Sequence, residues 1–182
     1  MSKIVLARIK LAQPTVHMWR DVVETLRLLG WRPVGGSYGL DWGSVTFQRG
    51  GRFLTVARSG DRLELAIPHG HTMREAEQVR REWERALLLA YFVGALRSMG
   101  RRVSIRGRTV IGVGRQRIIR ITVGDGECEV NFLLYPGDEC EMDDAQLRVA
   151  LAERGLVLQP MAEVKKYAGR RAERRVGAWR SG

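Results

Sequence analysis

A single long helix, predicted between two runs of short strands, is the feature that most limits how this chain can fold. Thr72 and Glu75 stand three residues apart, in the spacing of a helix-capping box. The helical pattern then continues to Met99, and Gly100 follows as a stop signal. At about 1.5 Å per residue such a helix is roughly 40 Å long. Its first half is charged and its second half is apolar, so we expect the second half to be buried.

Short apolar segments separated by glycines predict strands on both sides of this helix. On the N-terminal side we expect a strand over residues 4–9, a helix capped by Thr15 and ended by Gly30, and three strands that carry Val45 and Phe47, Leu54 and Val56, and Leu63 to Ile67. On the C-terminal side we expect strands over residues 102–106, 109–113, 117–123 and 128–134, a helix over residues 144–153 capped by Asp143, and a last strand over residues 156–164. If residues 135–138 turn a hairpin, Cys128 and Cys140 do not come opposite each other and cannot form a disulfide.

These elements predict an α+β fold in which helices pack on mixed, mainly antiparallel sheet. The three predicted helices all end at a glycine that is followed by a strand, at Gly30, Gly100 and Gly155. This repetition can arise by chance, because glycine caps are common at helix ends. The alternative explanation is a duplicated unit, consisting of a helix followed by a meander of strands. We expect three segments: an N-terminal α+β half with the long helix over residues 1–100, a C-terminal α+β half over residues 101–164, and a basic tail over residues 165–182.

The composition predicts a folded protein of the cytoplasm. The chain has 182 residues, of which 45% are hydrophobic, enough for one core or two interlocked ones. Its longest apolar stretch, Ala86 to Ala95, is too short to span a bilayer, and no signal-peptide pattern begins the chain. The two cysteines, Cys128 and Cys140, form no disulfide framework.

Charge is sorted along the C-terminal part of the chain. Seven arginines and no acids lie between Arg101 and Arg120, and eight carboxylates and no base lie between Asp125 and Asp144. The tail from Lys165 to Gly182 adds seven bases against one acid, and the whole chain carries a formal charge of +11. Separate basic segments of this kind can focus a positive field on a phosphate backbone.

The arginine-rich segment has the alternation of exposed strands. Ile119, Ile121 and Val123 fall on one face and Arg120 with Thr122 on the other, and Arg102 and Arg106 alternate in the same way against apolar neighbours. A ribbon of this kind would contact phosphates without reading bases. Its predicted binding residues are Arg101, Arg102, Arg106, Arg108, Arg115 and Arg120. In the alternative explanation these arginines pair with the acidic segment of the same half.

The tail has too few apolar residues to bury, so alone it should be disordered. Basic arms that carry an aromatic residue for stacking are common in proteins that bind nucleic acids. The predicted contacts are Lys165, Lys166, Tyr167, Arg170, Arg171, Arg174, Arg175, Trp179 and Arg180. Docking on an acidic protein, or on the acidic segment of a second copy, is the competing interpretation.

Other motifs are better explained by structural roles than by a catalytic, metal-binding or phosphate-binding site. His69 and His71 with a cysteine could form a zinc site, but two solvent-facing histidines before a helix cap are the simpler explanation. Gly112 and Gly114 resemble a phosphate loop, yet no helix is predicted to follow them. Flanking glutamates disfavour a thiolate at either cysteine. The acids from Asp138 to Asp144 lack the spacing of a calcium loop. No catalytic residue, metal site or cofactor is therefore predicted.

Four segments of the first two thirds of the chain together resemble a known family. They are VETLRLLGW at 23–31, YGLD at 38–41, RLEL at 62–65 and YFVGALRSMGRRV at 91–103. Over about residues 3–123 the chain resembles, mainly in the order of its elements, uncharacterised conserved proteins encoded in cyanobacteria and algal plastids as conserved hypothetical chloroplast reading frames. The resemblance implies an α+β fold and a soluble protein, and no site residue.

The sequence favours a non-enzymatic protein that binds nucleic acid through the arginine ribbon and the basic arm. The expected partner is RNA or a nucleoprotein assembly. A subunit or adaptor of a protein complex that docks by charge complementarity is the second interpretation. An enzyme that uses carboxylates not yet singled out is the third. No membrane partner is expected.

Overall fold

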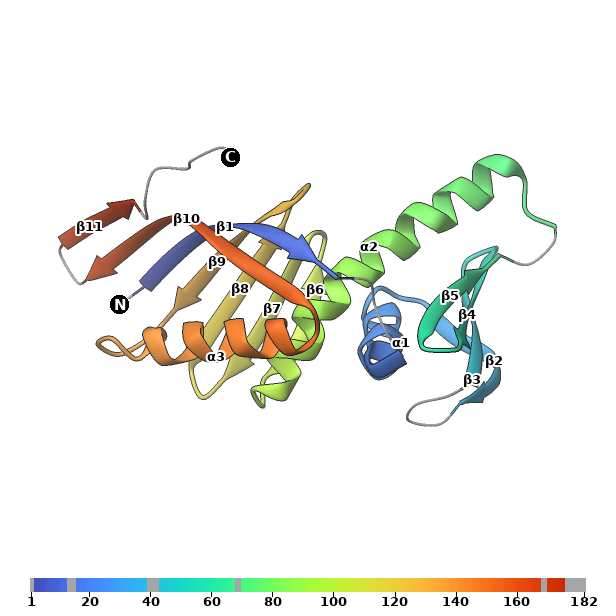
Figure 1. The fold of residues 1–182 in the computed structure, drawn as a ribbon, viewed down its shortest axis with the longest axis horizontal. Coiled ribbons are helices and arrows are strands. Elements are labelled where there is room, and N and C mark those ends of the chain that lie inside the picture. Colours follow the sequence, from blue (N-terminus) through green and yellow to red (C-terminus); the bar gives the residue numbers. More distant parts are fainter. Residues whose placement is uncertain (1, 13–15, 39–42, 68–69, 168–169, 176–182) are drawn as a thin grey trace. The chain divides into compact units, whose positions relative to one another are not determined.

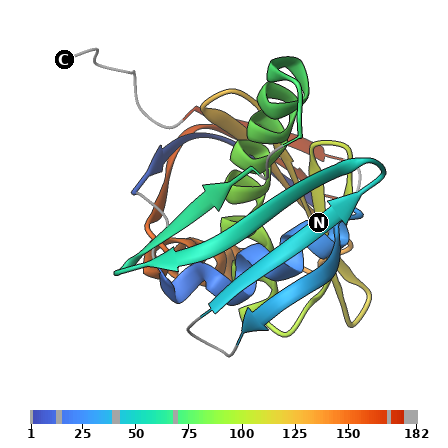
Figure 2. The ribbon, with the colours of Figure 1, turned by 90° about the vertical axis from the view of Figure 1, so that its right-hand side faces the viewer.

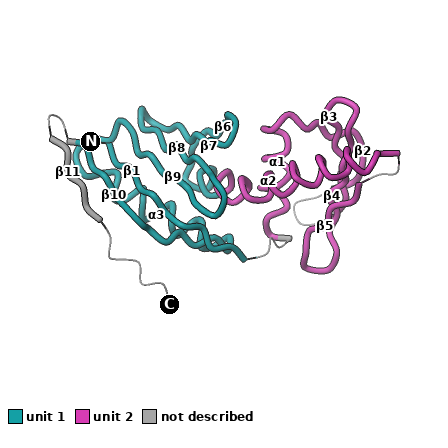
Figure 3. Tube along the Cα trace, turned by 90° about the horizontal axis from the view of Figure 1, so that it is seen from above, with its two compact units in different colours: residues 1–12, 95–182 teal, residues 13–94 magenta. Residues whose placement is uncertain are grey.

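The computed structural model describes residues 2–12, 16–38, 43–67, 70–167 and 170–175. They divide into two compact units, coloured separately in Figure 3. Unit 1 comprises residues 1–12 and 95–182, and unit 2 comprises residues 13–94. The first strand, expected in the N-terminal half, therefore belongs with the C-terminal half.

Unit 2 is a four-stranded antiparallel sheet with helices on one face. The short 3₁₀ helix Val16–Met18 leads into α1 (Trp19–Leu28), and the sheet follows as β2 (Arg32–Tyr38), β3 (Gly43–Arg49), β4 (Arg52–Ser59) and β5 (Arg62–Ala66). Most of α2 (Met73–Ser98) completes the unit, and α1 and α2 lie on the same side of the sheet (Figure 2). Val45, Phe47, Leu54 and Val56 are fully buried on the covered face.

Unit 1 is built around a larger antiparallel sheet that α3 covers (Figure 1). Its strands are β1 (Ser2–Leu11), β6 (Arg102–Arg106), β7 (Thr109–Gly114), β8 (Arg117–Val123), β9 (Glu127–Leu133), β10 (Leu156–Tyr167) and β11 (Arg170–Arg175), and its helix is α3 (Cys140–Glu153). The order across the sheet is β11-β10-β1-β9-β8-β7-β6. The last residues of α2 also belong to this unit.

The two faces of the seven-stranded sheet differ. The inner face carries buried Val5, Val110, Ile119, Ile121, Val130 and Phe132. At Gly112 an added Cβ would lie 3.1 Å from the Leu96 side chain, so the end of α2 packs closely on β7. The residues that alternate with this inner set point to the opposite side, which we call the outer face, and they are half-buried or exposed.

The α+β class is confirmed, and every strand pairing in the described residues is antiparallel. The capping box is present, because Thr72 Oγ1 accepts from the Glu75 amide and Glu75 accepts from the Thr72 amide. Gly30 and Gly100, which follow α1 and α2, have φ angles of 90° and 76°, the left-handed region that glycine enters at little cost. Each of these glycines precedes a four-strand meander.

Two local predictions are wrong. Residues 135–138 do not turn a hairpin: β9 ends at Leu133 and the chain passes into α3. Accordingly α3 begins at Cys140 and not at Asp144, and Asp143 lies inside its first turn, where the helix dipole favours a carboxylate. The predicted cap Thr15 lies outside the described residues.

Two segments are also more regular than expected. The glycine-rich connection after Trp31 forms β2, which pairs with β3 despite a register shift near Pro33. The tail, expected to be disordered alone, continues β10 to Tyr167 and adds β11, which pairs with β10 over Arg170–Arg175. No helix in the described part of the chain is long and apolar enough to cross a membrane.

A buried ammonium ties three elements of unit 1 together. Lys3 of β1 is 1% exposed, and its Nζ lies 2.7 Å from Asp144 Oδ2 and 2.8 Å from Glu141 Oε2, both on α3. Glu163 of β10 is 3.3 Å away. Burial alone would lower the pKa of Lys3, but the hydrogen bonds to Asp144 and Glu141 raise it above its ordinary value. The ammonium therefore stays charged at neutral pH.

The other members of this cluster balance its charge. Lys165 of β10 pairs with Glu141 and Glu163, and Arg148 donates to Asp144 at 3.0 Å. Burial opposes ionisation of Glu141, yet the hydrogen bonds from Lys165 and Lys3 lower its pKa overall. Three cations thus meet three carboxylates between the inner face and α3.

We expect Lys3→Met to lower the free energy of unfolding by about 3–5 kcal/mol, because it removes the one fully buried cation of the cluster. Among the described residues, Asp144 and Glu163 then keep only the partly exposed Arg148 and Lys165. Urea denaturation measures the loss. Lys10→Met is the matched control, since Lys10 is exposed on the same strand. Equal stability of the two variants would show that the ammonium does not hold α3 to the sheet.

Candidate nucleic-acid interface

Arginines gather at one end of the outer face, on β6, β7 and β8. Arg102 and Arg106 project from β6, and Arg120 projects from β8. Arg108 lies in the turn between β6 and β7, and Arg115 lies in the turn between β7 and β8, where its φ is 43°. All five side chains are exposed. The predicted alternation of these strands is confirmed by the burial of Ile119 and Ile121 between them.

None of these five arginine side chains makes a hydrogen bond or an ion pair within the described residues. The residues directly opposite three of them on the neighbouring strands are uncharged. The register places Val113 beside Arg102, Ile111 and Asn131 beside Arg120, and Thr109 beside Arg106. The guanidinium groups therefore stand over half-buried aliphatic and hydroxyl side chains, and each keeps its donors for an external acceptor.

Strand geometry sets the spacing of this group. Arg102 and Arg106 are four residues apart on one strand, about 13 Å between Cα atoms. Arg120 is two strands away and half-way between them along the strand direction, about 12 Å from each by the same geometry. The three form a triangle on one surface, which suits several phosphates of one strand better than a single small anion.

Arg101, also predicted as a binding residue, is a structural residue instead. Its side chain is 7% exposed and forms an ion pair with Asp143 of α3. One guanidinium nitrogen donates to the Tyr135 hydroxyl at 2.7 Å, and the other donates to the Arg117 carbonyl at 3.0 Å. Arg101 therefore joins the start of β6, the start of β8 and α3, and it is turned away from the outer face.

Tyr135 completes this second cluster. Its ring is 1% exposed, and its hydroxyl donates to Asp143. Burial and the hydrogen bond to Asp143 raise the pKa of Tyr135, so the phenol stays neutral. Arg117 lies over the Tyr135 ring, 5.6 Å from its centroid, and pairs with Glu139.

The alternative explanation, that the arginines pair with the acidic segment, therefore holds for two of the seven. Arg101 and Arg117 pair with Asp143 and Glu139. Two further acids of that segment, Glu141 and Asp144, belong to the Lys3 cluster. The C-terminal acids are thus engaged inside unit 1, and the outer-face arginines are not.

The predicted tail residues are only partly described. Lys165 is engaged in the Lys3 cluster, whereas Lys166 is exposed on the outer-face side of β10, opposite Ser2. The backbone of Tyr167 ends β10, and Arg170, Arg171, Arg174 and Arg175 lie in β11. Trp179 and Arg180 lie outside the described residues, as does His69.

The histidine and cysteine side chains of the described residues form no metal site and no nucleophilic site. His71 accepts a hydrogen bond from the Phe53 amide, and in the described part of the chain no three His, Cys, Asp or Glu side chains are placed to hold a metal. Cys128 and Cys140 are both buried and free. Burial raises the pKa of Cys128 to about 12 and also raises that of Cys140. Neither thiol is a nucleophile at neutral pH.

We expect Arg101→Met to lower the free energy of unfolding by about 3 kcal/mol, because Asp143 loses its buried partner. Arg102→Met, one residue away and exposed, should change stability by less than about 0.5 kcal/mol. Urea denaturation of both variants checks the difference. Equal losses would contradict the separation of a structural arginine from a surface one.

We also expect neither cysteine of the native protein to react with a thiol reagent such as DTNB, since both are buried and protonated. Unfolding in guanidinium should release two reactive thiols. Rapid reaction of the native protein would show that Cys128 or Cys140 is accessible and ionised. The absorbance of the coloured thiolate that DTNB releases measures the reaction.

Comparison with protein-family models, with curated proteins and with solved structures gives no match to this chain. The outer face of the seven-stranded sheet is the basis for a functional proposal.

Proposed function

We propose that this protein is a non-enzymatic nucleic-acid-binding protein, with single-stranded RNA, alone or in a nucleoprotein assembly, as its ligand. One observation carries the proposal. Arg102, Arg106, Arg108, Arg115 and Arg120 are exposed on one end of one sheet and have no internal acceptor in the described residues. Guanidinium groups in this state are suited to phosphate, which they bind with a planar fork of donors.

The outer face also suits the bases of a single strand. Ile111, Val113 and Ile118 are half-buried between the arginines and offer an apolar surface. No aromatic residue stands on this face in β1, β6, β7, β8 or β9, so stacking would fall to the arginine planes and to the tail. An open sheet surface contacts flat, unpaired bases more closely than it contacts the grooves of a duplex.

The basic tail would extend the same surface. Lys166 pairs in register with Ser2 on the outer side of β10, and β11 continues the sheet beyond it. β11 contains four arginines and is at the opposite edge of the sheet from β6. A strand of RNA held at both ends of the sheet would cross the outer face.

A subunit or adaptor of a protein complex is the second candidate. It is favoured by apolar residues on the exposed side of α3, where Met142 is 68% and Val149 is 59% exposed. Large apolar side chains at such positions are typical of protein contacts. This surface is separate from the outer-face arginines, since α3 covers the other side of the sheet (Figure 1).

The test is the triple change Arg102→Gln, Arg106→Gln and Arg120→Gln in the full chain. We expect weaker binding of a fluorescent single-stranded RNA, measured by anisotropy at several salt concentrations. If each arginine holds one phosphate, the slope of log affinity against log salt should fall by about 2, since each contact to a single strand contributes roughly 0.7.

A second triple variant separates specific contacts from net charge. Arg20, Arg62 and Arg74 are exposed in unit 2 and make no hydrogen bond or ion pair in the described residues. Changing them to glutamine removes the same charge. Equal losses for the two variants would contradict an interface on β6 to β8, and no binding by the wild type at low salt would reject the nucleic-acid proposal.

A further inference from the structure

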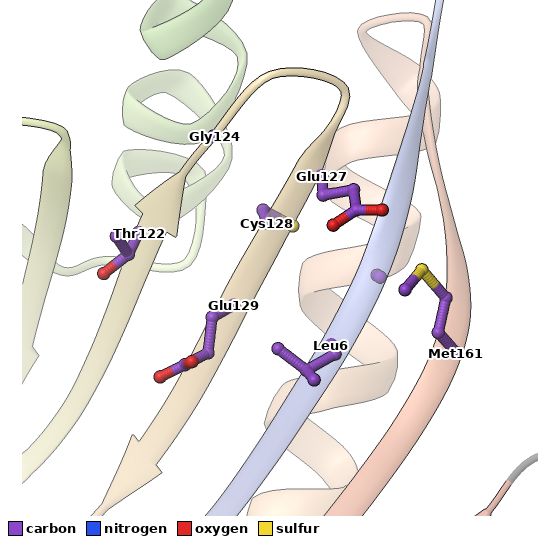
Figure 4. Close-up of a pocket in the computed structure, with 8 residues that line it drawn as sticks. Leu6, Thr122, Gly124, Glu127, Cys128, Glu129 and Met161 are labelled. Carbon is purple, nitrogen blue, oxygen red and sulfur yellow. The ribbon is translucent and has the colours of Figure 1, made fainter.

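A hollow opens on the outer face beside the arginines, where β8, β9, β1 and β10 run next to one another (Figure 4). Its volume is about 190 Å³, and Leu6, Thr122, Glu127, Glu129 and Met161 contribute to its lining. Drug-sized ligands usually occupy at least about 300 Å³. The hollow is therefore large enough only for a smaller group, such as one nucleobase.

The lining combines apolar walls with hydrogen-bond acceptors. Leu6 and Met161 supply the apolar part, and Glu127 and Glu129 supply two carboxylates (Figure 4). No basic side chain lines the hollow among the described residues. These carboxylates are also not placed, with Cys128 between them, to hold a metal ion. A flat ligand that presents N–H donors at its edge fits this chemistry.

A neighbouring side chain holds the Glu129 carboxylate in place. One of its carboxylate oxygens accepts a hydrogen bond of 2.7 Å from the side-chain amide of Asn131. A carboxylate has further acceptor sites beyond the one that Asn131 uses. Asn131 lies two residues along β9 and is thus a positioning residue for the carboxylate.

The hollow is within one nucleotide of Arg120, one of the five outer-face arginines. Arg120 of β8 is opposite Asn131, so Glu129 is its diagonal neighbour across the strand pair. Diagonal neighbours on one face lie about 7–8 Å apart. This is comparable with the separation between the phosphate and the far edge of a base in one nucleotide. Arg120 and Glu129 make no ion pair with each other in the described structure.

Resting on the proposed function, we infer that the hollow is a base-binding pocket that prefers guanine, with the guanine edge on Glu129 and the phosphate of the same nucleotide on Arg120. Guanine presents two adjacent donors, N1–H and the N2 amino group, which match the two oxygens of one carboxylate. Uracil presents one N–H between two carbonyl oxygens, which the carboxylates repel. A protein that grips phosphates without reading bases would thereby gain a preference at one position.

The experiment uses the full chain and three labelled RNA twelve-mers: oligouridine, the same strand with one central guanosine, and the same strand with inosine there. Inosine lacks only the N2 amino group. We expect guanosine to improve the affinity over uridine about tenfold, the range of one good bidentate contact, and inosine to lose most of that gain. Anisotropy titration at one fixed salt concentration measures all three.

Glu129→Gln should abolish the guanosine preference and leave oligouridine affinity unchanged or slightly higher, because a negative charge is removed from the surface. Glu153→Gln, at an exposed position on α3, is the matched control and should keep the preference. Thermal unfolding confirms that both variants are folded.

The outcomes separate this pocket from the wider proposal. Equal binding of the guanosine and uridine strands by the wild type overturns the pocket and leaves phosphate binding intact. A preference that survives in Glu129→Gln also overturns it. No binding of any strand at low salt overturns both proposals.

Discussion

The ammonium of Lys3 is the interaction on which the arrangement of unit 1 depends. It is buried on the inner face of β1, and burying a charge is costly unless counter-charges accompany it. Asp144 and Glu141 supply them from α3, and Glu163 supplies one from β10. A cluster of this kind adds little net stability over an apolar core, but it excludes arrangements that would leave one of its members unpaired. It therefore fixes the position of α3 along the sheet, and with it the side of the sheet that stays open.

The features that the sequence predicted are those that local residues determine. The capping box of α2, the glycine ends of the helices and the alternation over residues 117–123 involve neighbours within four positions, and all are present. The role of Arg101 was missed because Asp143, its partner, is 42 residues away. Lys3 was missed for the same reason, since its partners on α3 are 138 and 141 residues distant. An isolated lysine within an apolar strand is the one signal that could have marked it.

In the strand pairing and in the candidate site, too, local features could be predicted from the sequence and long-range ones could not. Nothing local indicated that β1 inserts between β9 and β10, which moves the N-terminal strand into the C-terminal unit. β2 could not be predicted either, since Pro33 and two glycines break the alternation of a strand. One of these glycines is required by packing: at Gly36 an added Cβ would lie 2.1 Å from the Ser44 carbonyl oxygen of β3. The arginines of the outer face could be predicted from alternation alone. The hollow beside them could not, because it is lined from four strands that only the tertiary fold brings together.

The charge partition of the sequence has a different meaning in three dimensions. Read along the chain, eight carboxylates after seven arginines suggest neutralisation. However, α3 carries its acids to the inner face, where they meet Lys3, Lys165 and Arg101. The outer arginines Arg102, Arg106 and Arg120 are on the other side of the sheet, and layers in proteins lie about 10 Å apart. At physiological ionic strength charges farther apart than about 8 Å are largely screened when solvent lies between them. The acids of α3 therefore offset bases under the sheet and leave Arg102, Arg106 and Arg120 available to a polyanion. Glu127 and Glu129 of β9 are acids that share the outer face with these arginines.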